Sequence, residues 1–293
     1  MAAPSMIDCI KALRERTGAG MMDCKKALEE CGMDIEKACD WLREKGIAKA
    51  AKKAATRIAA EGLTLVKANG NRAIILEINC ETDFVAKGDA FKKLLNDVAD
   101  TVLEKNCGCL DCAKEAVNDI FTDASVKIGE KLDFRRFTIV EKQAGQEFGY
   151  YIHMGGKVSA IALIDKEDAE LAKDLSIHIA ASKPQYLTKA DIPADVIEHE
   201  TQVQLEAAKN DPKLSGKPEA ALVKIIEGKV NKIFADSVLY DQEYIMQDDA
   251  PVVGNYLKSK NVNVVKFVCY AVGEGIEKRQ ENFADEVMKQ AQN

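Results

Sequence analysis

Three cysteines lie close together in the segment CGCLDC, and thiols at this spacing can bind a metal or react with an oxidant. Cys107, Cys109 and Cys112 fall within six residues of each other. Structural zinc sites generally take four ligands, commonly from paired C-x₂-C units, and no fourth ligand is evident near this segment. A metal site and a thiol- or metal-dependent enzyme are therefore alternatives, and the sequence favours an incidental loop that is sensitive to oxidation.

The three histidines form no recognisable catalytic or metal-binding pattern. His153, His178 and His199 are far apart, and none belongs to an H-E-x-x-H motif or pairs closely with a cysteine. No phosphate-binding loop of the type G-x-x-x-x-G-K-[ST] is present. His178 has apolar neighbours on an expected helix, which favours a packed and hydrogen-bonded side chain. These patterns argue against an enzyme built on histidines, thiols or a bound nucleotide.

An acidic residue stands next to an aromatic one at a polar junction. The stretch NCETDFVAKGD, residues 79–89, follows an apolar strand-like run and precedes a helix-like run, and Asp83 and Phe84 are at its centre. A connecting loop does not need a bulky ring. Phe84 is therefore either packed beneath a strand-to-helix corner or available to another molecule, and the four residues TDFV alone favour the packed interpretation.

Length and composition indicate a globular protein of about two domains. The chain has 293 residues, of which 47% are hydrophobic and 30% charged, and its net charge is −7. Negative charge argues against direct binding of nucleic acid. No apolar run approaches the roughly 20 residues of a membrane-spanning helix, and no secretory signal is recognisable. We expect no membrane partner, and the scattered cysteines favour reduced thiols in the cytoplasm.

The N-terminal segment predicts three short helices. The first begins at Ser5, and Asp8 follows three residues later in a capping-box pattern. The second spans about residues 21–31 and precedes Gly32, which can adopt the left-handed conformation that ends a helix. Three helices of about ten residues bury too little surface for a catalytic unit, so we expect a small docking module.

The third helix of this module is expected to begin at Asp34 and to end at Gly46. An alanine-rich basic stretch follows, and its charges share one side of a helix. We interpret it as a solvated linker helix. Its basic residues are Lys49, Lys52, Lys53 and Arg57.

Two similar patterns of strands and helix follow the linker. The run LTLVKANGNRAIILEIN predicts a hairpin with a type I′ turn at Asn69–Gly70, and a helix capped by Asp89 comes next. Residues 147–181 repeat the order strand, Gly-Gly turn, strand and helix. The repetition indicates two duplicated halves, each with helices packed on one face of a sheet. Residues 262–272 are expected to return to the second sheet as a late strand.

Two long helices within residues 184–240 predict a helical hairpin. Its apolar stripe is first explained by packing of the two arms together, and self-association is a second use. The apolar residues are Val196, Val203, Leu205, Leu222, Ile225, Ile226 and Ile233. The last residues, NFADEVMKQAQN, are expected to form a short amphipathic helix.

Several separated blocks together resemble the elongation factor Ts family. The blocks are LRERTGAGMMDCKKAL at 13–28, IAKAAKK, AIILEINCETDFVAK, HIAASKP at 178–184 and VGEGIEK at 272–278. They occur in the family order and span most of the chain. The resemblance is thin at about residues 104–124, and Gly88 stands where the family motif has Asn.

The resemblance implies a guanine-nucleotide exchange factor for elongation factor Tu, which is a protein partner, with no cofactor and no bound metal of its own. It is not an enzyme, because no bond is made or broken. The resemblance assigns Thr82, Asp83, Phe84 and Val85 to the contact that disturbs the Mg²⁺ site of the partner.

The resemblance also assigns docking residues. It places Arg14, Met21 and Met22 at the docking surface, although core packing explains the two methionines from the pattern alone. His153 aligns with a further contact position. The hairpin resembles a region through which family members dimerise, so a homodimer is a further expectation. The alternative is an adaptor that binds partners through its N-terminal module, which resembles ubiquitin-associated (UBA) domains, without driving exchange.

The predicted fold class is α+β. It comprises a UBA-like three-helix module, a core of two duplicated antiparallel-sheet-plus-helix halves, a protruding helical hairpin and a C-terminal helix. The expected boundaries are 1–55 for the module and linker, 56–140 and 141–272 for the two halves, and 273–293 for the C-terminal helical module.

Overall fold

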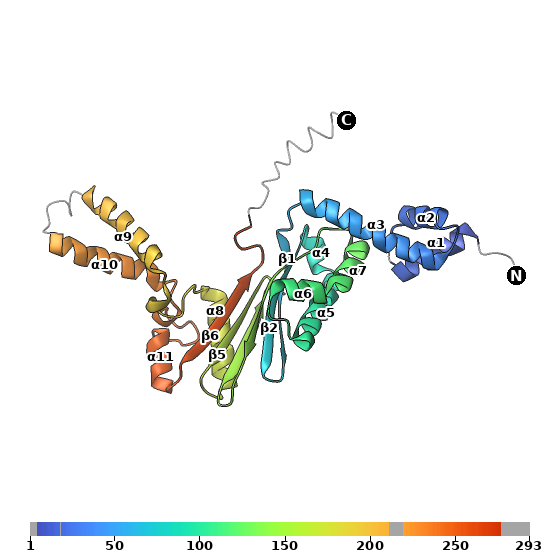
Figure 1. Ribbon diagram of the computed structural model, residues 1–293. Coiled ribbons are helices and arrows are strands. Elements are labelled where there is room, and N and C mark those ends of the chain that lie inside the picture. The colour runs from blue at the N-terminus through green and yellow to red at the C-terminus, as the bar shows by residue number, and fades with distance from the viewer. Residues whose placement is uncertain (1–4, 18, 211–218, 277–293) are drawn as a thin grey trace. The chain divides into compact units, whose positions relative to one another are not determined.

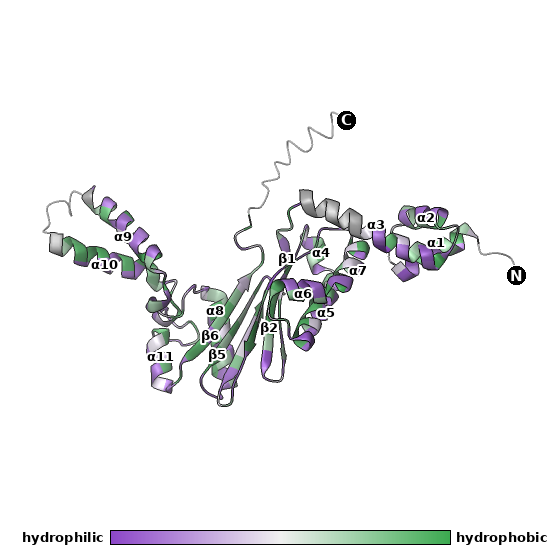
Figure 2. Cartoon of the chain, in the orientation of Figure 1, coloured by the Kyte–Doolittle hydropathy of each residue, from purple (hydrophilic) through white to green (hydrophobic). Residues whose placement is uncertain are grey.

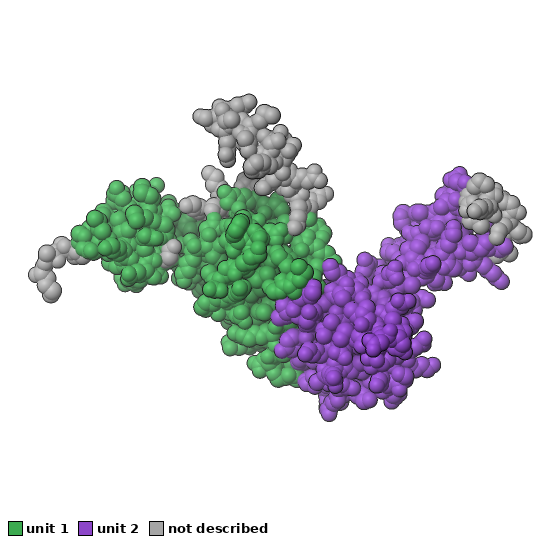
Figure 3. All heavy atoms as spheres, turned by 180° about the vertical axis from the view of Figure 1, so that it is seen from behind, with its two compact units in different colours: residues 1–139, 154–158, 270–293 green, residues 140–153, 159–269 purple. Residues whose placement is uncertain are grey.

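The computed structural model describes residues 5–17, 19–210 and 219–276, without the side chains of residues 47–56, 209, 219 and 220. The described chain is an α+β structure with two three-stranded sheets, which confirms the predicted fold class (Figure 1). It divides into two compact units (Figure 3). Unit 1 contains residues 1–139, 154–158 and 270–293, and unit 2 contains residues 140–153 and 159–269.

The N-terminal segment folds into three helices, as predicted. They are α1 (Met6–Thr17), α2 (Met21–Glu30) and α3 (Ile35–Thr56). The Ser5 hydroxyl accepts a hydrogen bond from the Asp8 amide (3.3 Å) and donates one to the Asp8 carboxylate (2.6 Å), so α1 begins with the expected cap. The helices share a small core of Cys9, Leu13, Ala19, Cys24, Ala27, Leu28, Ala38 and Leu42.

The prediction that the third helix ends at Gly46 is wrong, because α3 continues to Thr56. A Cβ atom at Gly46 would collide with Cγ2 of Val126, so the glycine permits close packing and does not end the helix. Val126 belongs to α7 (Asn118–Ile128). The side chains of Lys49, Lys52 and Lys53, predicted to be solvated, lie outside the described residues.

The first sheet has the order β1-β2-β3, with β1 (Glu61–Asn69), β2 (Arg72–Cys80) and β3 (Asp133–Glu141). Strands β1 and β2 form the predicted antiparallel hairpin, in which Asn69 pairs with Arg72. The predicted type I′ turn at Asn69–Gly70 is wrong. The two-residue loop is Gly70–Asn71, and only its first residue has a positive φ (61°), which is the type II′ pattern.

The core of unit 1 lies between β2 and the helices that follow it. These are α5 (Asp89–Lys105), α6 (Leu110–Ala116) and α7. The apolar face of α5 is buried as predicted, but Gly88 and not Asp89 is its N-cap residue. Elements α6, α7 and β3 were not predicted. The buried residues of this core include Ile74, Leu76, Ile78, Phe91, Leu94, Leu95, Val98, Val102 and Phe134.

A buried carboxylate on β2 holds the segment that follows β6 (Val264–Ala271). Glu77 is fully buried and accepts hydrogen bonds from Arg136 Nε (2.6 Å), Arg135 Nη1 (3.1 Å) and the Gly273 amide (2.8 Å). Burial raises the pKa of Glu77, but the Gly273 amide and Arg136 outweigh this effect, so the net pKa is lowered. The charge is therefore compensated inside the fold.

The second sheet has the order β4-β5-β6, with β4 (Glu147–His153) and β5 (Val158–Ile164). The late strand therefore joins this sheet as predicted. Helix α8 (Ala169–Ser182) packs on β4 where the strand has no side chain, because a Cβ atom at Gly149 would collide with the Ala172 backbone. Unit 2 also contains the short helices η1 (Lys189–Asp191), η2 (Leu239–Asp241) and α11 (Val253–Lys260).

Helices α9 (Ala194–Lys209) and α10 (Glu219–Ala235) form the predicted helical hairpin, and apolar residues are denser on α10 (Figure 2). The predicted stripe is only partly buried, since Ile226 is 2% exposed whereas Val203 and Ile233 are 46% and 45% exposed. Ala208 and Val230 complete the buried contact instead. Residues 211–218, between the two arms, and the predicted C-terminal helix within 277–293 lie outside the described residues.

Candidate partner-binding site at the junction of β2 and α4

The polar junction is a helical turn and not an extended loop. Helix α4 (Asp83–Lys87) begins directly after β2, and the Thr82 hydroxyl caps it by accepting a hydrogen bond from the Val85 amide (3.4 Å). Ala86 is fully buried, and Val85 packs against the same core. The apolar side of the turn is thereby anchored to unit 1.

Phe84 points away from that core. Its side chain is 83% exposed, the highest value among the exposed large hydrophobic residues that the structure describes. Successive helical residues are about 100° apart around the axis, so anchoring Val85 and Ala86 leaves Phe84 on the outer side. The interpretation of Phe84 as a packed corner residue is therefore wrong, and the ring contributes little to the stability of the fold.

Asp83 forms an ion pair within the same turn. Its carboxylate accepts a hydrogen bond from Lys87 Nζ at 2.6 Å. This hydrogen bond lowers the pKa of Asp83, so the carboxylate is ionised at neutral pH. The side chain is 44% exposed and remains accessible to a partner.

Glu130 holds the beginning of this turn from a distant position in the sequence. One carboxylate oxygen, Oε2, accepts the amides of Glu81 (3.0 Å) and Thr82 (3.1 Å). The other, Oε1, accepts the Thr82 hydroxyl at 2.7 Å. Hydrogen bonds to a charged acceptor are roughly twice as strong as neutral ones, so the first residues of α4 have a fixed position.

Glu81 also binds the segment that carries Glu130. Its Oε1 accepts the Lys131 amide at 2.6 Å, and its Oε2 pairs with Arg57 Nη1 at 2.8 Å. Lys131 Nζ in turn donates to the Arg57 carbonyl (2.8 Å). We call Glu81, Thr82, Glu130 and Lys131 the junction bracket. Sequence reasoning missed Glu130, because nothing in its local pattern indicates proximity to Thr82.

The expected docking residues are exposed on the N-terminal module. Met21 and Met22 at the start of α2 are 58% and 73% exposed, and Arg14 on α1 is also exposed. Core packing does not explain the two methionines, because the buried residues of α2 are Cys24, Ala27 and Leu28. Ile7 on α1, which was not predicted, is a further exposed apolar residue at 65%.

His153 lies in unit 2, at the end of β4, whereas the junction belongs to unit 1. It is exposed, and its Nδ1 lies 3.2 Å from the Tyr151 hydroxyl. Within unit 1 the structure brings Thr82, Asp83, Phe84 and Val85 together on one turn.

Other candidate chemistry in the described chain has structural explanations. His178 is buried, with Nε2 3.0 Å from Gln242 Oε1, and burial lowers its pKa, so the predicted packed histidine is confirmed. Among residues 5–17, 19–210 and 219–276, no three histidine, cysteine or acidic side chains converge as a metal site. No helix within these ranges has the length and apolar character that crossing a membrane requires.

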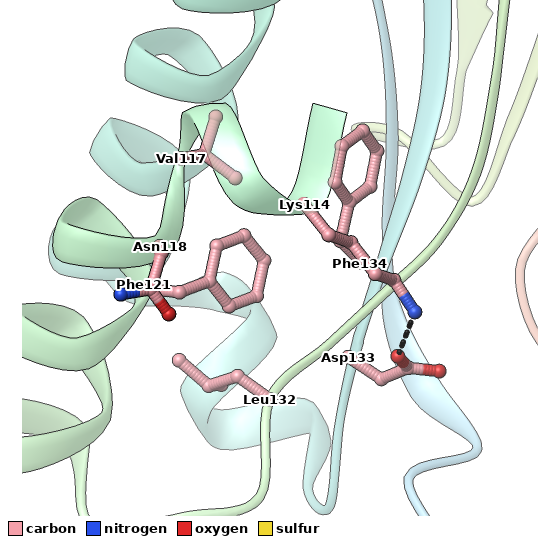
Figure 4. A pocket seen from close by; sticks show the side chains of 7 residues that line it. All are labelled: Lys114, Val117, Asn118, Phe121, Leu132, Asp133 and Phe134. Atoms are coloured by element: carbon pink, nitrogen blue, oxygen red, sulfur yellow. Dashed lines mark hydrogen bonds and ion pairs between the residues drawn. The ribbon is translucent and has the colours of Figure 1, made fainter. Parts of the chain in front are cut away.

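A cavity of about 200 Å³ lies between α6, α7 and the start of β3 (Figure 4). Phe121, Leu132 and Phe134 give it an apolar lining, and the ion pair between Lys114 and Asp133 (3.4 Å) crosses its rim. Lys114 and Asp133 neutralise each other's charge, and Asn118 is the one other polar residue of the lining.

An exposed ring on a fixed helical turn is a surface suited to binding another protein. Residues 81–274, more than half of the sequence, match the family described as Elongation factor TS. The chain belongs to the elongation factor Ts family. It is therefore a translation elongation factor, and the family implies elongation factor Tu as its partner. The match includes the junction and His153, whereas Arg14, Met21 and Met22 precede it.

Proposed function

We propose that this protein promotes release of GDP from elongation factor Tu. In this proposal Phe84 inserts into an apolar slot of the partner, and Asp83 engages partner groups close to the nucleotide. The observation that carries the proposal is the 83% exposure of a phenylalanine on a turn whose first residues are fixed by Glu130.

The exposed ring supplies binding free energy only in the complex. Transfer of a phenylalanine side chain from water to an apolar site is worth about 1.5–3 kcal/mol. A flexible loop would lose part of this gain to the ordering of its backbone on binding. The junction bracket supports the proposal, because it orders Thr82 before any partner arrives.

Displacement of Mg²⁺ accounts for faster release of the nucleotide. Mg²⁺ requires nearly octahedral oxygen ligands and bridges the protein to the phosphates. A shift of one ligand by about an ångström removes much of its hold on GDP. Factor and nucleotide then bind with negative coupling, so each weakens the other by the same factor and incoming GTP expels the factor. The protein is not an enzyme in this scheme, because no covalent bond changes.

The N-terminal module supplies affinity in this proposal. Arg14, Met21 and Met22 would dock on the partner, and methionine suits such a surface because its side chain adapts to irregular shapes. His153 would make a separate contact from unit 2. The domain boundaries expected from the sequence, a homodimer through the α9–α10 hairpin and a cytoplasmic location belong to the same proposal.

Release of fluorescent GDP from purified elongation factor Tu tests the proposal directly. The release rate should rise with the concentration of this protein and approach a plateau. Tight binding to the partner without any acceleration would contradict exchange activity. That result would favour the alternative function, an adaptor that binds through the N-terminal module.

A further inference from the structure

The two exposed thiols of this protein, Cys109 and Cys112, lie close together in the sequence. All nine cysteines lie in the described part of the chain, and only Cys109 and Cys112 are exposed. Cys31, Cys39 and Cys269 are only partly exposed, so Cys109 and Cys112 are the two thiols most accessible to an oxidant in solution. They are separated by two residues, and both stand at the start of α6.

The first turn of α6 brings the two side chains together. Cys109 is the N-cap residue, and its sulfur accepts a hydrogen bond from the Cys112 amide, with an N···S distance of 3.4 Å. The sulfur of Cys109 thus lies directly beside the backbone of Cys112. The Cys112 side chain is hydrogen-bonded with Cys107, so it must rotate before its sulfur can join that of Cys109.

Cys107 is a third thiol near the pair, but its surroundings differ. It is 3% exposed and belongs to the apolar core of unit 1. Burial raises the pKa of Cys107, and a hydrogen bond with Cys112 acts in the same direction. Because the thiolate is the reactive form, Cys107 is a poorer nucleophile and a poorer target for oxidants.

We propose that Cys109 and Cys112 are a reversible oxidation site that hydroperoxides convert to a disulfide. One exposed thiolate attacks the peroxide O–O bond, which yields a sulfenic acid and, after proton transfer, releases water or an alcohol. The second thiol then attacks the sulfenic sulfur, the S–S bond forms, and water leaves. The two sulfurs lose two electrons, which reduce the peroxide. A dithiol reductant restores both thiols by exchange.

Peptide mass spectrometry of the full chain tests this site. The protein is treated with hydrogen peroxide, the peroxide is removed, and free thiols are capped with iodoacetamide in denaturant. Cleavage after Lys105 and Lys114 releases one peptide that contains all three clustered cysteines. We expect this peptide to carry one capped thiol and to weigh two hydrogen atoms less than the reduced peptide with one capped thiol. Treatment with dithiothreitol before capping should restore three capped thiols.

Single variants identify the bonded pair. Cys107→Ser should still form the disulfide, whereas Cys109→Ser and Cys112→Ser should not. Cys109→Ser removes the thiol without disturbing the helix, since a serine hydroxyl also accepts a hydrogen bond from the Cys112 amide and caps the helix. A disulfide that persists in Cys109→Ser, or three capped thiols in the oxidised wild type, would overturn the proposal.

Discussion

Glu130 Oε1 lies 2.7 Å from the Thr82 hydroxyl that caps α4, although the two residues are 48 positions apart in the sequence. Two further hydrogen bonds, from the amides of Glu81 and Thr82, end on the same carboxylate. The turn that presents Phe84 is therefore positioned by the segment that follows α7. Glu130 can thus influence the orientation of the exposed Phe84 ring without contacting a partner itself.

Replacing Glu130 by Gln should weaken exchange more than docking. The amide side chain removes the charge that accepts three hydrogen bonds, and bonds to a charged group are worth about 1.5–3 kcal/mol each. We expect a lower maximal rate of GDP release with little change in the concentration that gives half of that rate. Hydrogen exchange at the Glu81 and Thr82 amides should become faster.

Glu115→Gln removes an exposed charge on α6 and is the control for the change in charge. It should leave the maximal rate of GDP release and the half-maximal concentration unchanged. If Glu130→Gln raises the half-maximal concentration and keeps the maximal rate, the bracket has no role in aiming Phe84.

Met22→Ala should raise the protein concentration that gives half of the maximal rate of GDP release and leave the maximal rate unchanged. This side chain is 73% exposed, so its truncation should change the free energy of unfolding by less than about 0.5 kcal/mol. Loss of an anchor residue from an interface costs about 1–2 kcal/mol, which corresponds to roughly 5–30-fold weaker binding. A titration of GDP release against protein concentration measures this shift. Ile245→Ala, which truncates another exposed residue (52%), should cause none.

Glu77→Gln should reduce stability in a manner that depends on pH. Breaking a buried ion pair costs about 3–5 kcal/mol, and the low end applies because Arg135 and Arg136 are 23% and 28% exposed. The folded-state pKa of Glu77 is lowered, so its contribution is present above the unfolded value of about 4.3 and is lost as the pH falls through the folded value.

Denaturant unfolding of both proteins from neutral to acid pH measures this contribution. The difference in the free energy of unfolding between wild type and Glu77→Gln should be largest near neutrality and should shrink on acidification. A difference that stays constant with pH would mean that the charge of Glu77 does not stabilise the fold.

Two glycines in unit 2 should respond oppositely to alanine. Gly149→Ala forces a methyl group against the Ala172 backbone, and overpacking of this kind costs about 1–3 kcal/mol. Gly228 lies in α10, and no atom lies within 4 Å of the position that an added methyl group would take, so Gly228→Ala should stabilise the helix by up to about 1 kcal/mol. Thermal unfolding distinguishes the two, and a stable Gly149→Ala protein would contradict the close packing of α8 on β4.

Elements with a clear apolar period were predictable, and elements shaped by distant contacts were not. The helix α5 and the buried strand β2 follow their patterns directly. Strand β3 was missed because Arg135 and Arg136 interrupt its apolar residues, and these arginines are explained only by the buried Glu77 on β2. Gly46 has the local pattern of a helix end. The real reason for the glycine is its close contact with Val126, which is distant along the chain and therefore not visible in the local sequence.

The candidate site was predictable only in part. Thr82–Val85 entered through the family resemblance, and local pattern alone favoured a buried Phe84. Its exposure follows from the helical turn that buries Ala86, and the sequence at this position did not indicate that turn. Glu130 required the folded chain, since its role depends on a contact with a distant segment.

Phe84→Ala compared with wild type is the most direct test of the account. The variant should unfold as wild type does, because the side chain is exposed, whereas Phe91→Ala in the core should lose about 3–5 kcal/mol. Stimulated release of fluorescent GDP from elongation factor Tu should fall by about 10–150-fold in Phe84→Ala, as expected from the loss of about 1.5–3 kcal/mol of contact. Full stimulation by a normally folded Phe84→Ala protein would contradict the role of this ring in exchange.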